Sequence, residues 1–302
     1  MRKRHPVLFG LLLLSLIGVA FFFLVYGMSS VKGDKTTFIA KDRIGVVPVK
    51  GVILDSKPVN DVLEKYSKDD SIKAIILRID TPGGGVGPSQ EIFDKVRSVR
   101  KKGKTVVASM GSMATSGGYY VACAAEKIVA NPGTLTGSIG VIMHFTNVED
   151  LFKKVGLRAS VIKSGKYKDA GSPFRDMTKE ERELLQALID DVHEQFVEAV
   201  SGSRTLDKEK VKEIADGRIF TGRQAVGLKL VDELGDLEHA AEVAATLAQL
   251  DGKPELVYPK EERRSVWRYM MEEMVSVLKR EMVETVVETG PGLSYIYVGQ
   301  GR

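Results

Sequence analysis

The segment MGSMATSGGYYVACAAEKIVANPGTLTGSIGVI, residues 110–142, contains two glycine turns, SMATSGGYYVA and TLTGSIGVI, next to apolar runs. The run TVVASM that leads into it, residues 105–110, is rich in β-branched residues and predicts a strand. The stretch SGGYYVACAAEK after the first turn has alanines and an apolar spacing that favour a helix. A strand therefore passes through a glycine turn into a helix.

The same alternation of strand and helix extends toward the N-terminus. RIGVVPVKGVIL, residues 43–54, and IKAIILRI, residues 72–79, predict strands. Between them, Val59, Val62 and Leu63 suit one face of a helix, and SQEIFDKVRSVRK predicts another helix before the next strand. Strands and helices that alternate through short turns predict an α/β domain with a largely parallel sheet.

Helices dominate the second half of the chain. TKEERELLQALIDDVHEQFVEAV, residues 178–200, predicts an amphipathic helix in which Thr178 is the N-cap and Glu181 completes a capping box. DLEHAAEVAATLAQL, residues 236–250, predicts another helix. Apolar residues also recur at helical spacing in SVWRYMMEEMVSVLKREMVETVVE, so residues 251–302 are interpreted as a C-terminal extension with an amphipathic helix.

The chain begins with an apolar run, VLFGLLLLSLIGVAFFFLVY, residues 7–26, which contains no charge. At about 1.5 Å per residue, a helix of this length crosses a bilayer core of about 30 Å. Because Arg2, Lys3 and Arg4 precede the run, the positive-inside rule keeps the N-terminus in the cytoplasm. The sequence predicts an uncleaved, single-pass anchor in the cytoplasmic (inner) membrane, with a cleaved signal peptide as the alternative.

These patterns divide the chain into five parts. They are a cytoplasmic N-terminus at 1–6, a transmembrane anchor at 7–26, a linker at 27–43, a domain at 44–250 and the extension at 251–302. With the N-terminus in the cytoplasm, the domain is expected on the periplasmic or extracytoplasmic side of the membrane.

Composition excludes several classes of protein. The 302 residues are 43% hydrophobic and 28% charged, which fits a globular chain and not a disordered one. There are 44 basic and 40 acidic residues, and three of the basic ones precede the anchor, so no nucleic-acid surface is indicated. The single cysteine, Cys123, excludes an intramolecular disulfide and a multi-cysteine zinc site. No metal or organic cofactor is predicted.

A third glycine turn occurs at DTPGGGVG, residues 80–87. A phosphate cradle is one interpretation, but a P-loop requires Gly-Lys-Ser/Thr, and Gly83, Gly84 and Gly85 are followed by valine. The sequence also lacks a properly spaced GxGxxG with a downstream acid. Unpaired amides after a strand favour an oxyanion or carbonyl-binding site instead.

Serine is the candidate nucleophile. Ser116 stands at the start of the helix predicted after the first turn, beside the amides of Gly117 and Gly118. The position suits a nucleophile and equally suits an ordinary N-cap. Ser112 is a weaker rival, and no GxSxG elbow occurs in the sequence.

A nucleophilic serine needs a base. Of the four histidines, His144 alone is predicted close to the glycine turns, so a Ser-His-Asp triad is not favoured. The others are His5, before the anchor, and His193 and His239, in amphipathic helices. Lysine is the other option, although its pKa must fall by about three units for it to act as a base at neutral pH. The segment around SGKYKDAGSPFRDMT offers Lys163, Lys166 and Lys168.

At this point the chain resembles the SppA-like signal peptide peptidases, membrane-bound serine peptidases related in fold to ClpP and the crotonases. The resemblance rests on DTPGGGV, the segment 110–142 and VIKSGKYKDAGSPFRDMTKEER, in that order, and covers residues 44–250. It implies an α/β fold with the repeated β-β-α units of the ClpP/crotonase-like architecture. It also implies an endopeptidase that degrades cleaved signal peptides and other membrane-derived peptides.

The resemblance implies roles for five residues. Ser116 is implied as the nucleophile, Lys168 as the general base, and Ser138 as a hydroxyl that hydrogen-bonds the lysine and orients it. The amides of Gly84 and Gly117 are implied as the oxyanion hole. Ser116 and Lys168 would then form a Ser-Lys dyad.

The residues themselves fit these roles with one difficulty. Ser138 is predicted to begin another strand, where its hydroxyl can serve as the orienting group. Asp169, next to Lys168, is a nearby carboxylate that would raise the pKa of the lysine. In an extended segment the two side chains point to opposite faces, which would remove the conflict.

Assembly and two alternative functions complete the expectations. In the long form of the family, which has two copies of the domain, the serine and the lysine come from different copies. A single copy that carries both therefore predicts a ring-like homo-oligomer whose site is completed by neighbouring subunits. A crotonase-like acyl-CoA enzyme is a second hypothesis, which the export anchor disfavours. A noncatalytic membrane scaffold, in which the apolar stripe of the tail recruits partner helices, is a third.

Overall fold

The computed structural model describes residues 15–19, 42–252, 254–259 and 294–296. The chain separates into two units, residues 1–41 and 42–302, and the folded domain belongs to the second. Of the predicted anchor, residues 15–19 are described and are helical, while the rest of the anchor and most of the linker lie outside the described residues. Within the described part of the chain, no helix is both long enough and apolar enough to cross a membrane.

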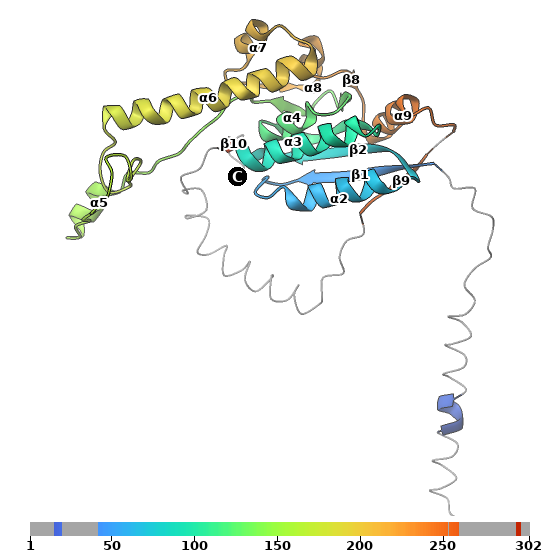
Figure 1. Cartoon of the computed structure of the whole chain (residues 1–302), viewed down its shortest axis with the longest axis horizontal. Helices are drawn as coiled ribbons and strands as arrows, with labels where there is room; N and C mark the ends of the chain where they lie inside the picture. The colour runs from blue at the N-terminus through green and yellow to red at the C-terminus, as the bar shows by residue number, and fades with distance from the viewer. Residues whose placement is uncertain (1–14, 20–41, 253, 260–293, 297–302) are drawn as a thin grey trace, which may run out of the picture. The chain divides into compact units, whose positions relative to one another are not determined.

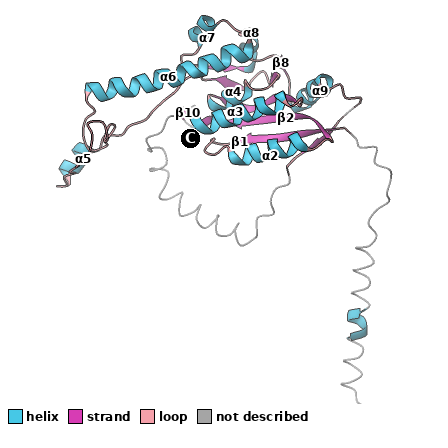
Figure 2. Ribbon diagram, viewed as in Figure 1, coloured by secondary structure: helices cyan, strands magenta, loops and turns pink. Residues whose placement is uncertain are grey.

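A mostly parallel sheet forms the centre of the domain (Figures 1 and 2). Its long strands are β1 (Arg43–Lys50), β2 (Ile72–Thr81) and β4 (Thr105–Thr115). β2 pairs in parallel with both of the others, with Leu77 opposite Val47 on one side and Ala108 on the other. The predicted α/β class with a parallel sheet is therefore confirmed.

Short strands extend this sheet. They are β5 (Lys127–Ala130), β6 (Leu135–Gly137), β7 (Ile219–Thr221), β8 (Glu233–Leu234) and β9 (Glu255–Val257). The strand order is β7-β6-β4-β2-β1-β9, with β5 beside β4 and β8 beside β5. Among the described strands of this sheet, β6 and β7 pair antiparallel and the other pairs are parallel.

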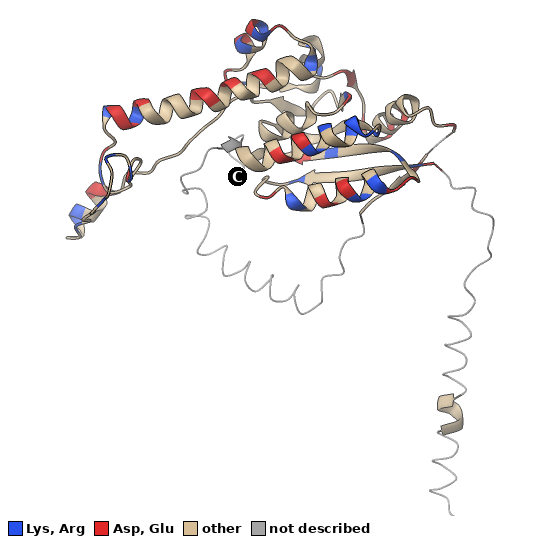
Figure 3. Ribbon diagram, in the orientation of Figure 1, with Lys and Arg blue, Asp and Glu red and all other residues tan. Residues whose placement is uncertain are grey.

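Helices cover both faces of the sheet, and charged residues are more frequent along helices than in the long strands (Figure 3). One face carries α2 (Lys57–Lys68), α3 (Val86–Lys101) and α4 (Gly117–Ala122), and the other carries α9 (Leu237–Leu247). Ile75 and Leu77 of β2 join Leu63 and Ile92 in the main core, whereas Ile76 packs under α9. Burial on both faces explains why the sequence of β2 is almost continuously apolar.

Residues 145–178 form a projection that we call the arm (Figure 1). The arm contains α5 (Glu149–Lys154) and returns to the domain at α6 (Lys179–Arg204). Thr178 and Glu181 form the predicted capping box, which confirms the start of this helix. Two short helices follow it, α7 (Lys208–Ile214) and α8 (Gly222–Gly227).

The strand predicted to begin at Ser138 is wrong. β6 ends at Gly137, and Ser138 follows it with a φ of 52°. A left-handed backbone conformation interrupts the extended path of a strand. The Ser138 N–H donates a hydrogen bond of 2.8 Å to the carbonyl of Arg218, which holds the residue in this turn.

The C-terminal extension contributes to the fold at two places. β9 lies beside β1 at the edge of the central sheet. β10 (Ser294–Ile296) pairs antiparallel with β3 (Gly83–Gly85). The amphipathic helix predicted in the tail falls within residues 260–293, outside the described residues.

Candidate active site

Ser116 occupies a sharp turn between β4 and α4. Its φ of 54° and ψ of −117° are unusual for a residue with a side chain, and such a conformation stores on the order of 1–3 kcal/mol of strain. Ser116 is 1% exposed and holds the N-cap position, yet its side chain makes no capping hydrogen bond. The ordinary N-cap interpretation is therefore not supported, and strain at a buried serine points to a functional turn.

The turn at Ser138 lies directly beside that of Ser116. Thr115 is opposite Gly137 where β4 and β6 end, and the Ser116 N–H donates to the Gly137 carbonyl at 2.8 Å. Ser138 is 7% exposed. The fold thus brings together two buried serines with positive φ that are well separated in the sequence.

Glycines allow α4 to approach the neighbouring strands closely. A Cβ on Gly118 would lie 2.6 Å from Cγ2 of Thr81, so α4 can pack here only with a glycine. The Tyr120 N–H donates to the Ser116 carbonyl at 2.8 Å, so the amide of Gly117 precedes the hydrogen-bond ladder of the helix. This amide lies next to the candidate nucleophile in the chain.

β3 is held on one side by Ile53. The Ile53 N–H donates to the Gly83 carbonyl and the Gly85 N–H donates to the Ile53 carbonyl, each at 2.8 Å. A Cβ on Gly84 would lie 2.1 Å from the Ile53 oxygen, which excludes a side chain. Because polar groups alternate along a strand, the N–H and C=O of Gly84 face the opposite edge. On that edge β10 places Tyr295 opposite Gly84, so β3 accepts an extended chain segment there.

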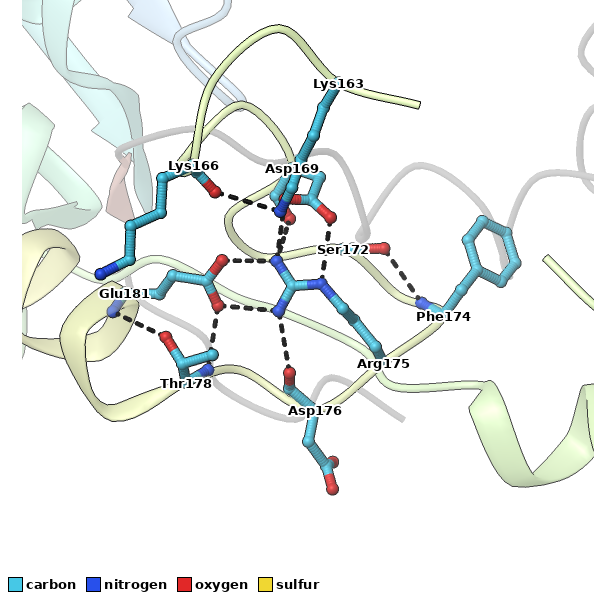
Figure 4. A network of polar contacts seen from close by, with 9 residues as sticks. All are labelled: Lys163, Lys166, Asp169, Ser172, Phe174, Arg175, Asp176, Thr178 and Glu181. Atoms are coloured by element: carbon cyan, nitrogen blue, oxygen red, sulfur yellow. Dashed lines mark hydrogen bonds and ion pairs between the residues drawn. The ribbon is translucent and has the colours of Figure 1, made fainter. Parts of the chain in front are cut away.

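The loop that carries Lys168 is a turn and not the predicted extended segment. The Lys168 N–H donates to the Gly165 carbonyl at 3.2 Å. The carboxylate of Asp169 pairs with Arg175, at 2.9 Å from Nη2 to Oδ1, and with Lys163 (Figure 4). Hydrogen bonds from Arg175 and then Lys163 lower the pKa of Asp169. The carboxylate that raised a difficulty for Lys168 therefore has two other cationic partners.

Lys168 and Ser116 are carried by different parts of the chain, the arm and the turn before α4. Lys168 is exposed on the arm, which joins the domain at the start of α6 (Figure 1). Near the other end of this helix, Phe196 packs on Tyr120 of α4 with 5.0 Å between ring centroids. Seventeen residues separate Lys179 from Phe196, about 25 Å of helix. Within one chain, backbone hydrogen bonds join the two serine turns, and the described hydrogen bond of Lys168 is to Gly165 of its own loop.

A cavity of about 510 Å³ opens beside Ser138. Its lining includes His144, His193, Asp190 and Asp216. The Nε2 atom of His193 is buried and has no hydrogen-bond partner among the described residues. In the sequence, His193 is an ordinary residue of an amphipathic helix. No local pattern marks it, since it reaches this cavity only because α6 passes beside the turn after β6.

Other candidate residues lie elsewhere. His239 contacts Glu233 at 2.9 Å and Glu242 at 3.3 Å beside α9, and His5 is outside the described residues. Cys123 is buried, and burial raises the pKa of its thiol to about 12, which excludes a thiolate nucleophile at neutral pH. In the described ranges, no group of three or more His, Cys, Asp or Glu side chains is placed to hold a metal ion.

Comparison with known proteins identifies relatives of this chain. Residues 98–251, about half of the chain, match peptidase family S49, and residues 55–134 match the Clp protease family. The Clp match agrees with the parallel sheet and supports the expected ClpP-like architecture.

Individual relatives lead to the same family. The chain is 50% identical over 213 residues to "Putative protease slr0021" of Synechocystis, an alignment that covers 70% of this chain and 76% of that protein. It is 40% identical over 214 residues to "Putative protease MJ0651" of Methanocaldococcus jannaschii, covering 70% and 68%. It is 38% identical over 178 residues to "Putative signal peptide peptidase SppA" of Enterococcus faecium, covering 59% and 52%. The resemblance to SppA-like peptidases is thereby confirmed, and the chain belongs to peptidase family S49.

Proposed function

We propose that this peptidase is a serine endopeptidase with Ser116 as nucleophile and Lys168 as general base. The observation that carries the proposal is the strained, buried Ser116 between β4 and α4, whose hydroxyl is not used to cap the helix. A turn of this kind holds a nucleophile in a fixed direction while the rest of the sheet resists relaxation.

The chemistry follows from the groups around this turn. Ser116 Oγ attacks the peptide carbonyl while Lys168 Nζ accepts its proton. The amides of Gly117 and Gly84 donate hydrogen bonds to the oxyanion. Lys168 then returns the proton to the leaving amine, and water hydrolyses the acyl-enzyme. Ser138, adjacent to Ser116, hydrogen-bonds the lysine and orients it.

In this proposal, Lys168 reaches Ser116 from a neighbouring subunit of a ring-like homo-oligomer. Large apolar side chains are exposed together on the arm, which favours contact with another protein surface. They are Leu151, Val155, Leu157, Val161 and Ile162. Such a contact would also remove Lys168 from water, and desolvation favours the neutral amine that a base requires.

The proposed substrates are cleaved signal peptides and other membrane-derived peptides. β10 lies antiparallel on β3, and a substrate that added to the same edge would be held by main-chain hydrogen bonds. The similarity to the Enterococcus faecium protein named as a signal peptide peptidase favours signal peptides. The apolar run 7–26 would anchor the peptidase in the cytoplasmic membrane, with its domain outside the cytoplasm.

The test is hydrolysis of a fluorogenic signal-peptide-like substrate by the full chain in detergent. We expect Ser116→Ala and Lys168→Ala each to lower kcat by at least about 10³-fold while the protein stays folded and assembled. Ser112→Ala is the matched control, because Ser112 is an exposed serine of the same strand, and it should keep full activity. Mixed Ser116→Ala and Lys168→Ala subunits should regain activity after subunit exchange.

Several outcomes would contradict this proposal. Full activity of Ser116→Ala or Lys168→Ala would reject the dyad. Activity that survives in Lys168→Ala but is lost in His144→Ala or His193→Ala would move the base to the cavity beside Ser138. Failure of the mixture, with exchange demonstrated, would reject completion by a neighbour. Binding of a CoA thioester would favour the acyl-CoA enzyme, and a biological phenotype retained by Ser116→Ala would favour the scaffold.

A further inference from the structure

We propose that Arg175 is a positioning residue that fixes the Lys168 loop by bridging Asp169 to Glu181 at the start of α6. The inference rests on the proposed function, in which Lys168 is the base. Arg175 acts through Asp169 and Glu181, whose oxygens accept its hydrogen bonds. Figure 4 shows its guanidinium between the loop and the first turn of the helix.

On the loop side, Arg175 holds the residue that follows Lys168. Its Nε donates to Asp169 Oδ2 at 3.0 Å, and its Nη2 donates to the Asp169 backbone carbonyl at 3.1 Å. Both the side chain and the main chain of Asp169 are thereby fixed. Because Lys168 is its covalent neighbour, the direction in which the lysine leaves the loop is set by these contacts.

On the helix side, Arg175 is anchored to a carboxylate that cannot move freely. Nη1 donates to Glu181 Oε2 at 2.8 Å, and Nη2 pairs with the other oxygen. The Glu181 side chain is only 3% exposed. It also accepts a hydrogen bond of 2.9 Å from the Thr178 N–H, as the second half of the capping box. The loop is therefore tied to the beginning of a long, packed helix.

The geometry of this bridge is specific for arginine. A fifth bond, from Nη1 to the Asp176 carbonyl at 3.0 Å, completes the use of all five guanidinium N–H donors. A lysine at this position would offer three donors on a point charge and could not span both carboxylates in one plane. Hydrogen bonds to Arg175 lower the pKa of Glu181 to about 2, so the bridge is ionised at neutral pH.

Removal of Arg175 would also alter the charges around the base. Without Arg175, the Asp169 carboxylate would lose its bidentate partner and keep only its contact with Lys163. Lys163 Nζ also donates a hydrogen bond of 3.1 Å to the Lys166 carbonyl. A carboxylate released in this way can pair with Lys168 and favour the protonated amine. A misplaced base and a higher apparent pKa in the rate profile are therefore expected together.

The experiment compares Arg175→Ala, Arg175→Lys and Lys168→Ala of the full chain in detergent, with Arg182→Ala as the control. Arg182 is exposed in the same first turns of α6. We expect Arg175→Ala to lower kcat by about 10²-fold, because misplacement by about 1 Å has that effect, with KM within about twofold. Its rate should rise at a higher pH than that of the parent. Added guanidinium should restore part of kcat in Arg175→Ala, whereas Arg175→Lys should stay impaired and Arg182→Ala should match the parent.

The outcomes separate the two proposals. If Arg175→Ala keeps the kcat and pH profile of the parent while Lys168→Ala is inactive, the positioning role is wrong and the dyad stands. If Lys168→Ala is as active as the parent, the dyad itself is wrong. If Arg175→Ala fails to assemble, Arg175→Lys, which keeps the positive charge, becomes the test variant. A kcat equal to that of the parent in Arg175→Lys would then overturn the positioning role.

Discussion

The serine turns and the arm position their residues in different ways. Ser116 and Ser138 are buried, and backbone hydrogen bonds of 2.8 Å tie Ser116 to the end of β6 and Ser138 to Arg218, just before β7. The arm is exposed over 153–168, and the turn of Lys168 is held largely by polar contacts of Arg175. Backbone bonds within a sheet do not depend on assembly, whereas an exposed arm can adjust to a neighbour. In the proposed mechanism, the backbone of one chain therefore positions Ser116, and Lys168 is free to act on a neighbouring chain.

The largest difference between the two regions should come from adding one methyl group. Gly84→Ala would place its Cβ 2.1 Å from the Ile53 oxygen, and because the clash is with backbone, overpacking should cost about 1–3 kcal/mol and displace β3. Because β3 carries a proposed oxyanion amide, its displacement should also abolish peptidase activity. Gly165→Ala, in the arm, adds its Cβ to open space within the chain and should leave the stability of the chain unchanged. Thermal unfolding and peptide hydrolysis of both variants check this, and equal stability would refute the close packing of β3.

A polar substitution on the arm should separate assembly from folding. Ile162 is fully exposed, so Ile162→Ser should leave the unfolding temperature of the chain unchanged. If the arm contacts a neighbour, the same change should weaken the oligomer and lower activity by about tenfold or more. Leu247→Ser, at the end of α9, is the control for an exposed apolar residue outside the arm. Light scattering measures the size of the oligomer, and peptide hydrolysis at the same protein concentration measures the activity. An oligomer of unaltered size would count against the arm as an interface.

A smaller change, an increase in activity, is expected from a substitution at the edge of β3. Tyr295→Pro removes the N–H of the residue that pairs with Gly84 and should release β10 from that edge. Peptide hydrolysis should then rise several-fold because substrate no longer competes with the tail. Tyr295→Thr, which keeps the N–H and a high strand propensity, should behave like the parent. An unchanged rate in Tyr295→Pro would show that β10 does not compete with substrate.

The smallest expected effect is a loosening of the arm at low pH. The hydrogen bond from Arg175, followed by that from the Thr178 backbone, lowers the pKa of Glu181 from 4.5 to about 2. A depressed carboxyl pKa contributes stability that is present above pH 4.5 and lost as the pH falls toward 2. The backbone bonds of the serine turns do not titrate. Hydrogen exchange from neutral pH to about pH 3, corrected for intrinsic rates, should show 151–178 losing protection before 105–130. If both segments lost protection at the same pH, the arm and the serine turns would not differ in how their stability depends on pH.

Much of the fold could be predicted because its signals are local. The apolar run at 72–79 became β2, and Thr178 with Glu181 began a long helix as the capping pattern indicates. Ser138 was placed in the wrong element because a carbonyl of Arg218, far along the chain, holds it in a left-handed turn. Ser116 was placed correctly at a helix start, but its strain appears only when β4, α4 and β6 are packed together.

The sequence by itself determined the family, the alternation of strands and helices, and the candidates Ser116, Ser138 and Lys168, since motifs and periodicity are properties of neighbouring residues. Only the tertiary structure decided that the two serine turns meet and that Lys168 lies on a separate arm. It also decided that Arg175 forms an ion pair with Asp169, the acidic residue next to Lys168. These arrangements depend on which strands pair and on where a long helix carries the chain. Such contacts join residues far apart in sequence, and no local pattern encodes them.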